Sequence, residues 1–163
     1  MDIKKCVEYM KQKHYGQKRK HGDDYYTHPL AVSKILMEKG FGEDYVIAGI
    51  FHDLIEDTNA TYDEILELSN PIVTEAVRLV TKEKGYDIKD YFERISNNEV
   101  AKMVKLADRV HNLSESVYTS EKFRRKYVKE TEEYFIDLAK GTPFEEDIAR
   151  ELERIKETLE IER

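Results

Sequence analysis

The chain of 163 residues contains few residues that interrupt regular structure, with only seven glycines and three prolines. It has one cysteine, Cys6, which excludes an intramolecular disulfide and a zinc site built from several thiolates. Cys6 lies between Ile3 and Met10 at helical spacing, so we interpret it as a small core side chain rather than a reactive thiol. The scarcity of helix breakers favours long helices.

Long apolar runs are also missing from the sequence. No stretch approaches the roughly 18 to 20 consecutive apolar residues that a transmembrane helix needs. The opening sequence MDIKKCVEYM does not resemble a signal peptide, because Lys, Glu and Asp interrupt any apolar segment. We therefore expect a cytoplasmic protein with no membrane partner.

The charge balance is acidic, with 34 acidic and 27 basic residues and a formal net charge of −7. Non-specific binding to nucleic acid depends on neutralising phosphates, so we expect no nucleic-acid partner. Attraction for a small anionic substrate would have to come from local basic residues. The candidates are the runs Lys18–Lys20 and Lys122–Lys126, and for the second run we favour a solvated helix face.

Apolar residues recur with a period near 3.6 along most of the chain, and no stretch alternates with a period of two. This pattern predicts an all-α helical bundle that forms a single domain over residues 1–163, without a linker. The expected helices lie near residues 3–14, 27–39, 44–55, 61–68, 71–80, 91–95, 100–117, 122–139 and 144–161. Asp44 is the expected cap of the third helix, and TYDE at Thr61 is a capping-box pattern.

Polar side chains embedded in apolar helices are the most informative feature. His52 and Asp53 interrupt IAGIFHDLIED, and Asp108 lies within MVKLADRVHNL. Burying such groups costs several kcal/mol unless they are compensated, and a bound cation would compensate all of them. The alternative is a network of buried ion pairs in which Lys105 or Arg109 serves Asp108. We favour the metal site.

Helical spacing adds two further carboxylates to this region. Glu56 lies four residues after His52, and Asp57 lies four residues after Asp53, so each pair shares a helix face. Carboxylates so close repel one another unless a cation or a raised pKa relieves them. Asn112 likewise follows Asp108 by one turn.

The other histidines are weaker candidates for this site. We expect His14 and His21 to be surface or loop residues. His111 would project about 100° away from Asp108.

Several stretches between about Tyr15 and Gly141 resemble a known family. They are GQKRKHGDDYYTHPLAV, IAGIFHDLIEDTNATYDEI, RLVTK, VKLADRVHNL and, more weakly, VKETEEYFIDLAKG. The pattern H…HD…D is the signature of HD-domain phosphohydrolases. The chain resembles the hydrolase domain of the bifunctional (p)ppGpp synthetase/hydrolases. It also resembles the small stand-alone alarmone hydrolases, in particular because no synthetase region is present.

The resemblance implies roles for individual residues. The implied ligands of one divalent ion, usually Mn²⁺, are His28, His52, Asp53 and Asp108. On ligand softness alone, Mn, Fe and Zn suit this set about equally. The implied catalytic acidic pair is Glu56 and Asp57. The implied substrate contacts are Arg19, Lys20, Asn112 and Tyr134.

The implied reaction is hydrolysis of the 3′-diphosphate of (p)ppGpp, which releases pyrophosphate and GDP or GTP. The large bifunctional enzymes usually have Arg-Thr after the KLADRVHNL motif, whereas this chain has Ser114 and Glu115, which leaves the guanine preference open. One alternative is an HD phosphohydrolase acting on another small nucleotide, as a 5′-nucleotidase or an adenosine alarmone hydrolase. The other is a non-catalytic module that binds metal or nucleotide. The sequence carries no signal for oligomeric state.

Overall fold

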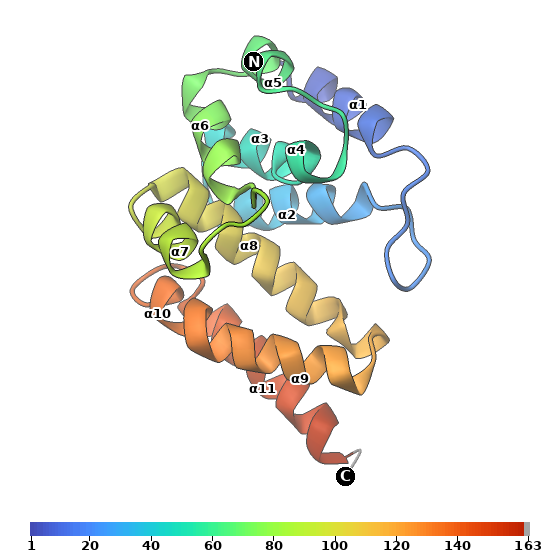
Figure 1. Ribbon diagram of the computed structural model, residues 1–163, viewed down its shortest axis with the longest axis vertical. Helices are drawn as coiled ribbons and strands as arrows, with labels where there is room; N and C mark the ends of the chain where they lie inside the picture. The colour runs from blue at the N-terminus through green and yellow to red at the C-terminus, as the bar shows by residue number, and fades with distance from the viewer. Residues whose placement is uncertain (162–163) are drawn as a thin grey trace. The chain divides into compact units, whose positions relative to one another are not determined.

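The computed structural model describes residues 1–161 as helices joined by turns (Figure 1). Within these residues no β-strand is present, and the only extended pairing is an isolated bridge between Lys18 and Asp24. The all-α prediction is confirmed. None of the helices in this part of the chain combines the length and the apolar character needed to cross a membrane.

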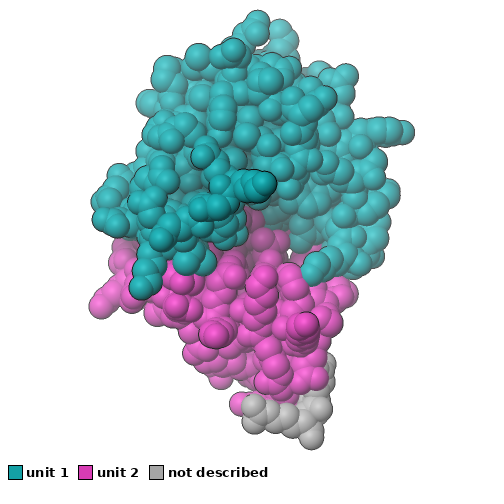
Figure 2. Space-filling view, viewed as in Figure 1, with its two compact units in different colours: residues 1–105 teal, residues 106–163 magenta. Residues whose placement is uncertain are grey.

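The chain divides into two compact units, one covering residues 1–105 and the other beginning at Leu106 (Figure 2). The boundary falls inside helix α8 (Glu99–Glu115). The first unit contains the following helices before α8: α1 (Ile3–Lys13), α2 (Thr27–Glu38), α3 (Glu43–Phe51), α4 (Leu54–Asp57), α5 (Tyr62–Leu68), α6 (Pro71–Val80) and α7 (Ile88–Ser96).

Helices α2 and α3 pack closely against each other in the first unit, and Gly49 makes this approach possible. A Cβ atom at Gly49 would lie 3.0 Å from Leu36 Cδ1 and 3.4 Å from Val32 Cγ1. Both of these side chains are fully buried and have little room to move. The glycine therefore sets the spacing between the helix that carries His28 and the helix that ends before His52.

Several helix ends follow directly from local sequence. Thr61 and Glu64 form the predicted capping box at the start of α5. Asn70 accepts a hydrogen bond from Val73 N–H at the start of α6, where Pro71 occupies the first helical position. The end of α2 is followed by Gly40 with φ of +86°, a backbone conformation that favours glycine.

The start of α3 differs from the prediction. Gly42, not Asp44, occupies the cap position, and its backbone is extended. Asp44 lies in the first helical turn, where its carboxylate accepts a hydrogen bond from Asn70 Nδ2 at 2.8 Å. An acidic side chain still stabilises this helix start, since the helix dipole is positive there.

The predicted continuous helix over residues 44–55 is interrupted. Helix α3 ends at Phe51 and α4 begins at Leu54, so His52 and Asp53 form the turn between them. Both residues keep right-handed helical backbone angles, and Asp57 N–H still bonds to the Asp53 carbonyl at 3.0 Å. The one-turn spacing from Asp53 to Asp57 therefore survives the break.

The second unit contains the C-terminal part of α8 followed by these elements: η1 (Ser116–Tyr118), α9 (Glu121–Glu130), η2 (Thr131–Phe135), α10 (Ile136–Ala139) and α11 (Glu145–Ile161). The segment η2 is a π-helix that continues α9 into α10 without a gap, so the helix predicted over 122–139 is confirmed, with a π segment inside it. Such π segments appear mostly as insertions within α-helices and frequently at functional sites.

Candidate metal centre and catalytic carboxylates

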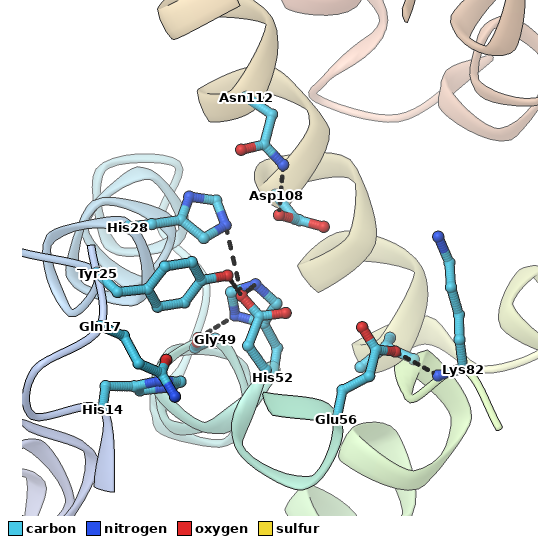
Figure 3. A network of polar contacts seen from close by, with 12 residues as sticks. His14, Gln17, Tyr25, His28, Gly49, His52, Glu56, Lys82, Asp108 and Asn112 are labelled. Atoms are coloured by element: carbon cyan, nitrogen blue, oxygen red, sulfur yellow. Dashed lines mark hydrogen bonds and ion pairs between the residues drawn. The ribbon is translucent and has the colours of Figure 1, made fainter. Parts of the chain in front are cut away.

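Two buried imidazoles and one carboxylate converge in the first unit (Figure 3). His28 near the start of α2 and His52 after α3 are 1% and 4% exposed. Their Nε2 atoms lie 3.8 Å and 3.0 Å from the same atom, Oδ2 of Asp53. The two rings pack edge to face with centroids 5.2 Å apart. Three of the four predicted ligands are therefore brought together within this unit.

The orientation of His52 is fixed by a backbone contact. Its Nδ1 lies 2.6 Å from the carbonyl oxygen of Gly49. Because a carbonyl only accepts, Nδ1 carries the proton, and the lone pair of neutral His52 is on Nε2. Metal-binding histidines commonly have this arrangement, in which one ring nitrogen donates to the protein and the other coordinates the ion.

Tyr25 contributes a contact that the sequence analysis did not identify. Its hydroxyl donates to Asp53 Oδ2 at 2.6 Å. Imidazole nitrogens together with a carboxylate oxygen form a donor set that divalent transition metals accept. The residues present in this unit fit such an ion.

A second cluster continues from the same carboxylate. Asp53, Glu56 and Asp57 each place a carboxylate oxygen within 4.8 Å of the others. Partial desolvation and, after it, the negative charges of Asp53 and Glu56 raise the pKa of Asp57 to about 6. His52 and a hydrogen bond from Tyr25 act in the opposite direction. The expected crowding of carboxylates is therefore present, and Asp57 titrates close to neutral pH.

Glu56 is held by an element distant in sequence. Its Oε1 accepts a hydrogen bond from the backbone N–H of Lys82 at 2.5 Å. Lys82 follows Thr81, the cap residue at the C-terminal end of α6. This contact fixes one oxygen of Glu56, although Glu56 and Asp57 are both exposed on the surface of the unit.

His14 is not the surface or loop residue that we predicted. It directly follows α1 and is 1% exposed. Its ring packs against Tyr25 with centroids 5.0 Å apart, and its Nδ1 lies 2.8 Å from Gln17 Oε1. Burial lowers the pKa of His14, so burial favours its neutral form. The prediction was wrong because the burial depends on residues that follow α1 and fold back over it.

Arg19 and Lys20 lie in a short loop between α1 and α2. The loop closes like a hairpin, since Tyr25 N–H donates to the Gln17 carbonyl and Arg19 N–H donates to the Asp23 carbonyl, both at 2.8 Å. The guanidinium carbon of Arg19 lies 5.9 Å from the centroid of the Tyr25 ring. Lys20 is exposed and Arg19 is half-buried.

The remaining predicted residues belong to the second unit. Asp108 on α8 is 8% exposed, and Asn112 Nδ2 donates to its Oδ1 at 3.0 Å. Arg109, the alternative ion-pair partner considered for Asp108, forms an ion pair with Glu130. Its guanidinium carbon also lies 4.2 Å from the centroid of the Phe135 ring. Arg109 therefore has a partner of its own within this unit.

The two other positions of interest in this unit are Tyr134 and Glu115. Tyr134 lies in the π-helix η2 and is half-buried. Glu115, where the chain departs from the bifunctional enzymes, lies 2.7 Å from His111 Nε2 through its Oε1. This contact pairs Glu115 with an imidazole one helical turn earlier on α8.

Comparison with known proteins places the chain among recognisable relatives. Residues 6–91 match a family model described as HD domain. The chain is 34% identical over 164 residues to GTP pyrophosphokinase rsh of Brucella melitensis biotype 1, which covers 94% of the chain and 22% of that protein. It is also 34% identical over 146 residues to guanosine-3′,5′-bis(diphosphate) 3′-pyrophosphohydrolase of Aquifex aeolicus, covering 85% of the chain and 21% of that protein.

A solved structure matches over most of both chains. It is described as a metazoan ortholog of SpoT that hydrolyzes ppGpp, and it aligns with a TM-score of 0.81 at 26% identity. The match covers 93% of this chain and 94% of that one. The two curated relatives are much longer, since the chain spans only 22% and 21% of their lengths.

Proposed function

Because the chain belongs to the HD-domain family, we propose that it is a metal-dependent phosphohydrolase acting on guanosine alarmones. The proposed reaction removes the 3′-diphosphate of (p)ppGpp and yields pyrophosphate with GDP or GTP. This proposal rests mainly on the convergence of His28 Nε2 and His52 Nε2 on Asp53 Oδ2. The carboxylates of Glu56 and Asp57 lie next to this point. The activities for which the Aquifex and metazoan relatives are named support the choice of substrate.

The proposed ligands of the ion are His28, His52, Asp53 and Asp108, and the proposed ion is Mn²⁺. The tautomer of His52 and the hydrogen bond from Asn112 to Asp108 support this set, because each keeps a donor atom oriented. When bound, such an ion neutralises phosphate charge and lowers the pKa of a coordinated water.

Asp57 is the proposed general base. A pKa of about 6 leaves it largely ionised at neutral pH yet able to accept a proton, which is the range in which a general base is most effective. One oxygen of Glu56 accepts the hydrogen bond from Lys82 N–H. The proposed role of the other oxygen is to transfer a proton to the leaving group. This difference in contacts supports the proposed division of roles between the two acids.

The proposed substrate contacts are Arg19, Lys20, Asn112 and Tyr134. Arg19 and Lys20 lie in the hairpin that ends at Tyr25, whose hydroxyl contacts Asp53. A guanidinium and an ammonium there can bind the phosphates of an anionic nucleotide even though the whole chain is acidic.

The test is an assay of the purified full chain with Mn²⁺, Mg²⁺ or Zn²⁺ against ppGpp, ppApp and simple 5′-mononucleotides. We expect Mn²⁺-dependent release of pyrophosphate from ppGpp, abolished by a chelator and restored by added metal. Release of pyrophosphate from ppApp alone would change the proposed nucleobase of the substrate from guanine to adenine. Orthophosphate from 5′-monophosphates, with no turnover of ppGpp, would reject the alarmone assignment.

A further inference from the structure

Three side chains near the proposed site have no role as ligands or as the acidic pair. They are His14 after α1, Gln17 at the start of the hairpin and Tyr25 at its end. His14 and Tyr25 pack ring against ring, with centroids 5.0 Å apart. His14 Nδ1 lies 2.8 Å from Gln17 Oε1. The three therefore form one contiguous group within the first unit.

Gln17 connects this group to the proposed general base. Its Nε2 donates to the backbone carbonyl of Asp57 at 2.8 Å, across 40 residues of sequence. The amide orientation is then determined, because the nitrogen faces Asp57 and the oxygen faces His14. His14 must carry its proton on Nδ1 to complete the contact. The two hydrogen bonds run in one direction, from His14 through Gln17 to Asp57.

Tyr25 connects the same group to Asp53. Its hydroxyl donates to Asp53 Oδ2 at 2.6 Å. Its backbone N–H closes the hairpin by donating to the Gln17 carbonyl at 2.8 Å. The hairpin that carries Arg19 and Lys20 is thus fastened at its base to the segment from Asp53 to Asp57.

We propose that His14, Gln17 and Tyr25 are positioning residues that hold the Arg19–Lys20 hairpin in register with Asp53 and Asp57. This inference rests on the proposed function, because it assigns phosphate binding to the hairpin and proton transfer to Asp57. Their hydrogen bonds span the base of the hairpin and the two carboxylate positions. Binding and chemistry are therefore coupled through Gln17.

The coupling predicts a distinctive kinetic result. Replacing Gln17 with Met removes both hydrogen bonds at similar side-chain volume, so the hairpin and the Asp57 backbone both lose their anchor. We expect kcat to fall and KM to rise together, each on the order of 10-fold, since small misplacements of reacting groups cost up to about 100-fold. Gln12→Met is the matched control, because Gln12 is an exposed glutamine on α1.

Three further variants distinguish the contributions of Tyr25 and His14. Tyr25→Phe removes only the hydroxyl, and Tyr15→Phe is its control because Tyr15 is 88% exposed. His14→Asn can keep a donor where Nδ1 lies, whereas His14→Leu removes it. We expect Tyr25→Phe and His14→Leu to be impaired like Gln17→Met, and His14→Asn to recover most of the lost kcat. Equal loss in His14→Asn and His14→Leu would overturn the role given to that donor.

Amide hydrogen exchange on the metal-free protein tests the inference without any assay of activity. We expect Gln17→Met to speed exchange severalfold at residues 17–25 and 54–58 and to leave residues 62–80 unchanged. Faster exchange throughout residues 1–105, or none in the two segments, would overturn the positioning role. If the wild type does not hydrolyse alarmones, the proposed function fails. The exchange pattern still decides whether the hydrogen bonds of Gln17 hold the hairpin to the segment that contains Asp57.

Discussion

The Nδ1 atom of His52 lies 2.6 Å from the carbonyl oxygen of Gly49, and this contact coincides with the end of helix α3. Gly49 also lies where α3 approaches α2, with Leu36 and Val32 facing it. The same residue therefore sets the helix spacing and orients an imidazole. Packing in the core and geometry at the proposed metal centre are linked at this position.

Gly49→Ala tests that link. The new Cβ atom would lie 3.0 Å from Leu36 Cδ1, so this buried side chain or the helix that carries it must shift by a few tenths of an ångström. We expect a loss of about 1 to 3 kcal/mol in the free energy of unfolding, the usual cost of overpacking. We also expect about 10-fold weaker Mn²⁺ binding, since disturbing the partner of a ligating histidine has effects of that size.

Denaturant unfolding and calorimetric titration of Mn²⁺ measure these two effects. Gly42→Ala is the matched control, because no atom lies within 4 Å of a Cβ at Gly42 and its φ is an ordinary −77°. Unchanged metal affinity in a clearly destabilised Gly49→Ala protein would separate the packing role from the orienting role.

Asp57→Asn should have opposite effects on stability and activity. Folding raises the pKa of Asp57 from its ordinary value of 3.8 to about 6. A raised folded-state pKa contributes stability below about pH 3.8 that is lost as the pH rises through about 6. Asparagine carries no such charge, so the metal-free variant should be more stable than wild type at about pH 7.5. The difference should shrink towards about pH 4.

The activity of Asp57→Asn should fall by about 10² to 10⁴, the usual contribution of a general base, while the protein still binds Mn²⁺. Denaturation of the metal-free protein at the two pH values and titration with Mn²⁺ are the measurements. Asp63→Asn, at an exposed position in the same unit, is the control. Loss of metal binding in Asp57→Asn would assign this residue to the ligand set instead.

The sequence predicted most helices because their ends are determined locally. The capping box at Thr61 and Pro71 at the start of α6 are signals carried within a few residues. The break at His52 was not predictable in this way, because hydrophobic periodicity reports burial and not hydrogen bonding. The apolar run continues through the turn, whereas the Gly49 contact appears only in three dimensions.

The residues that support the site were harder to predict than the proposed ligands. His52 and Asp53 are recognisable because burial of a polar side chain needs compensation, whereas His28 was indicated only by the family resemblance. Gln17 contacts a residue 40 positions away and Tyr25 contacts one 28 positions away, so neither contact leaves a local pattern. His14 was misjudged for the same reason, since its burial depends on the hairpin that follows it.

Arg19→Ala should mainly weaken substrate binding. Its guanidinium is the proposed phosphate contact, and a hydrogen bond to a charged group contributes about 1.5 to 3 kcal/mol. We expect KM for ppGpp to rise by about 10- to 100-fold while kcat stays within about twofold. Arg78→Ala is the control, because Arg78 on α6 forms an exposed ion pair with Glu75. An unchanged KM would remove Arg19 from the substrate site.

Asp108→Asn removes one negative charge while preserving side-chain size. If Asp108 is a direct ligand, Mn²⁺ affinity should fall by more than about 100-fold, since loss of a supporting contact alone costs about 10- to 100-fold. Activity should be lost with it. Mn²⁺ at about 100 times its Kd should stabilise wild type by about 2.7 kcal/mol, because the ion binds only the folded state, and the variant should gain almost nothing.

Thermal unfolding with and without Mn²⁺ measures this difference independently of catalysis. Asp137→Asn, an exposed acid in the same unit, should keep the full metal-dependent rise in Tm. A full rise in Asp108→Asn would leave His28, His52 and Asp53 to hold the ion without it. Asn112→Ala should have an intermediate effect on Mn²⁺ affinity, because it removes only the 3.0 Å hydrogen bond to Asp108. Its affinity should therefore fall between that of wild type and that of Asp108→Asn.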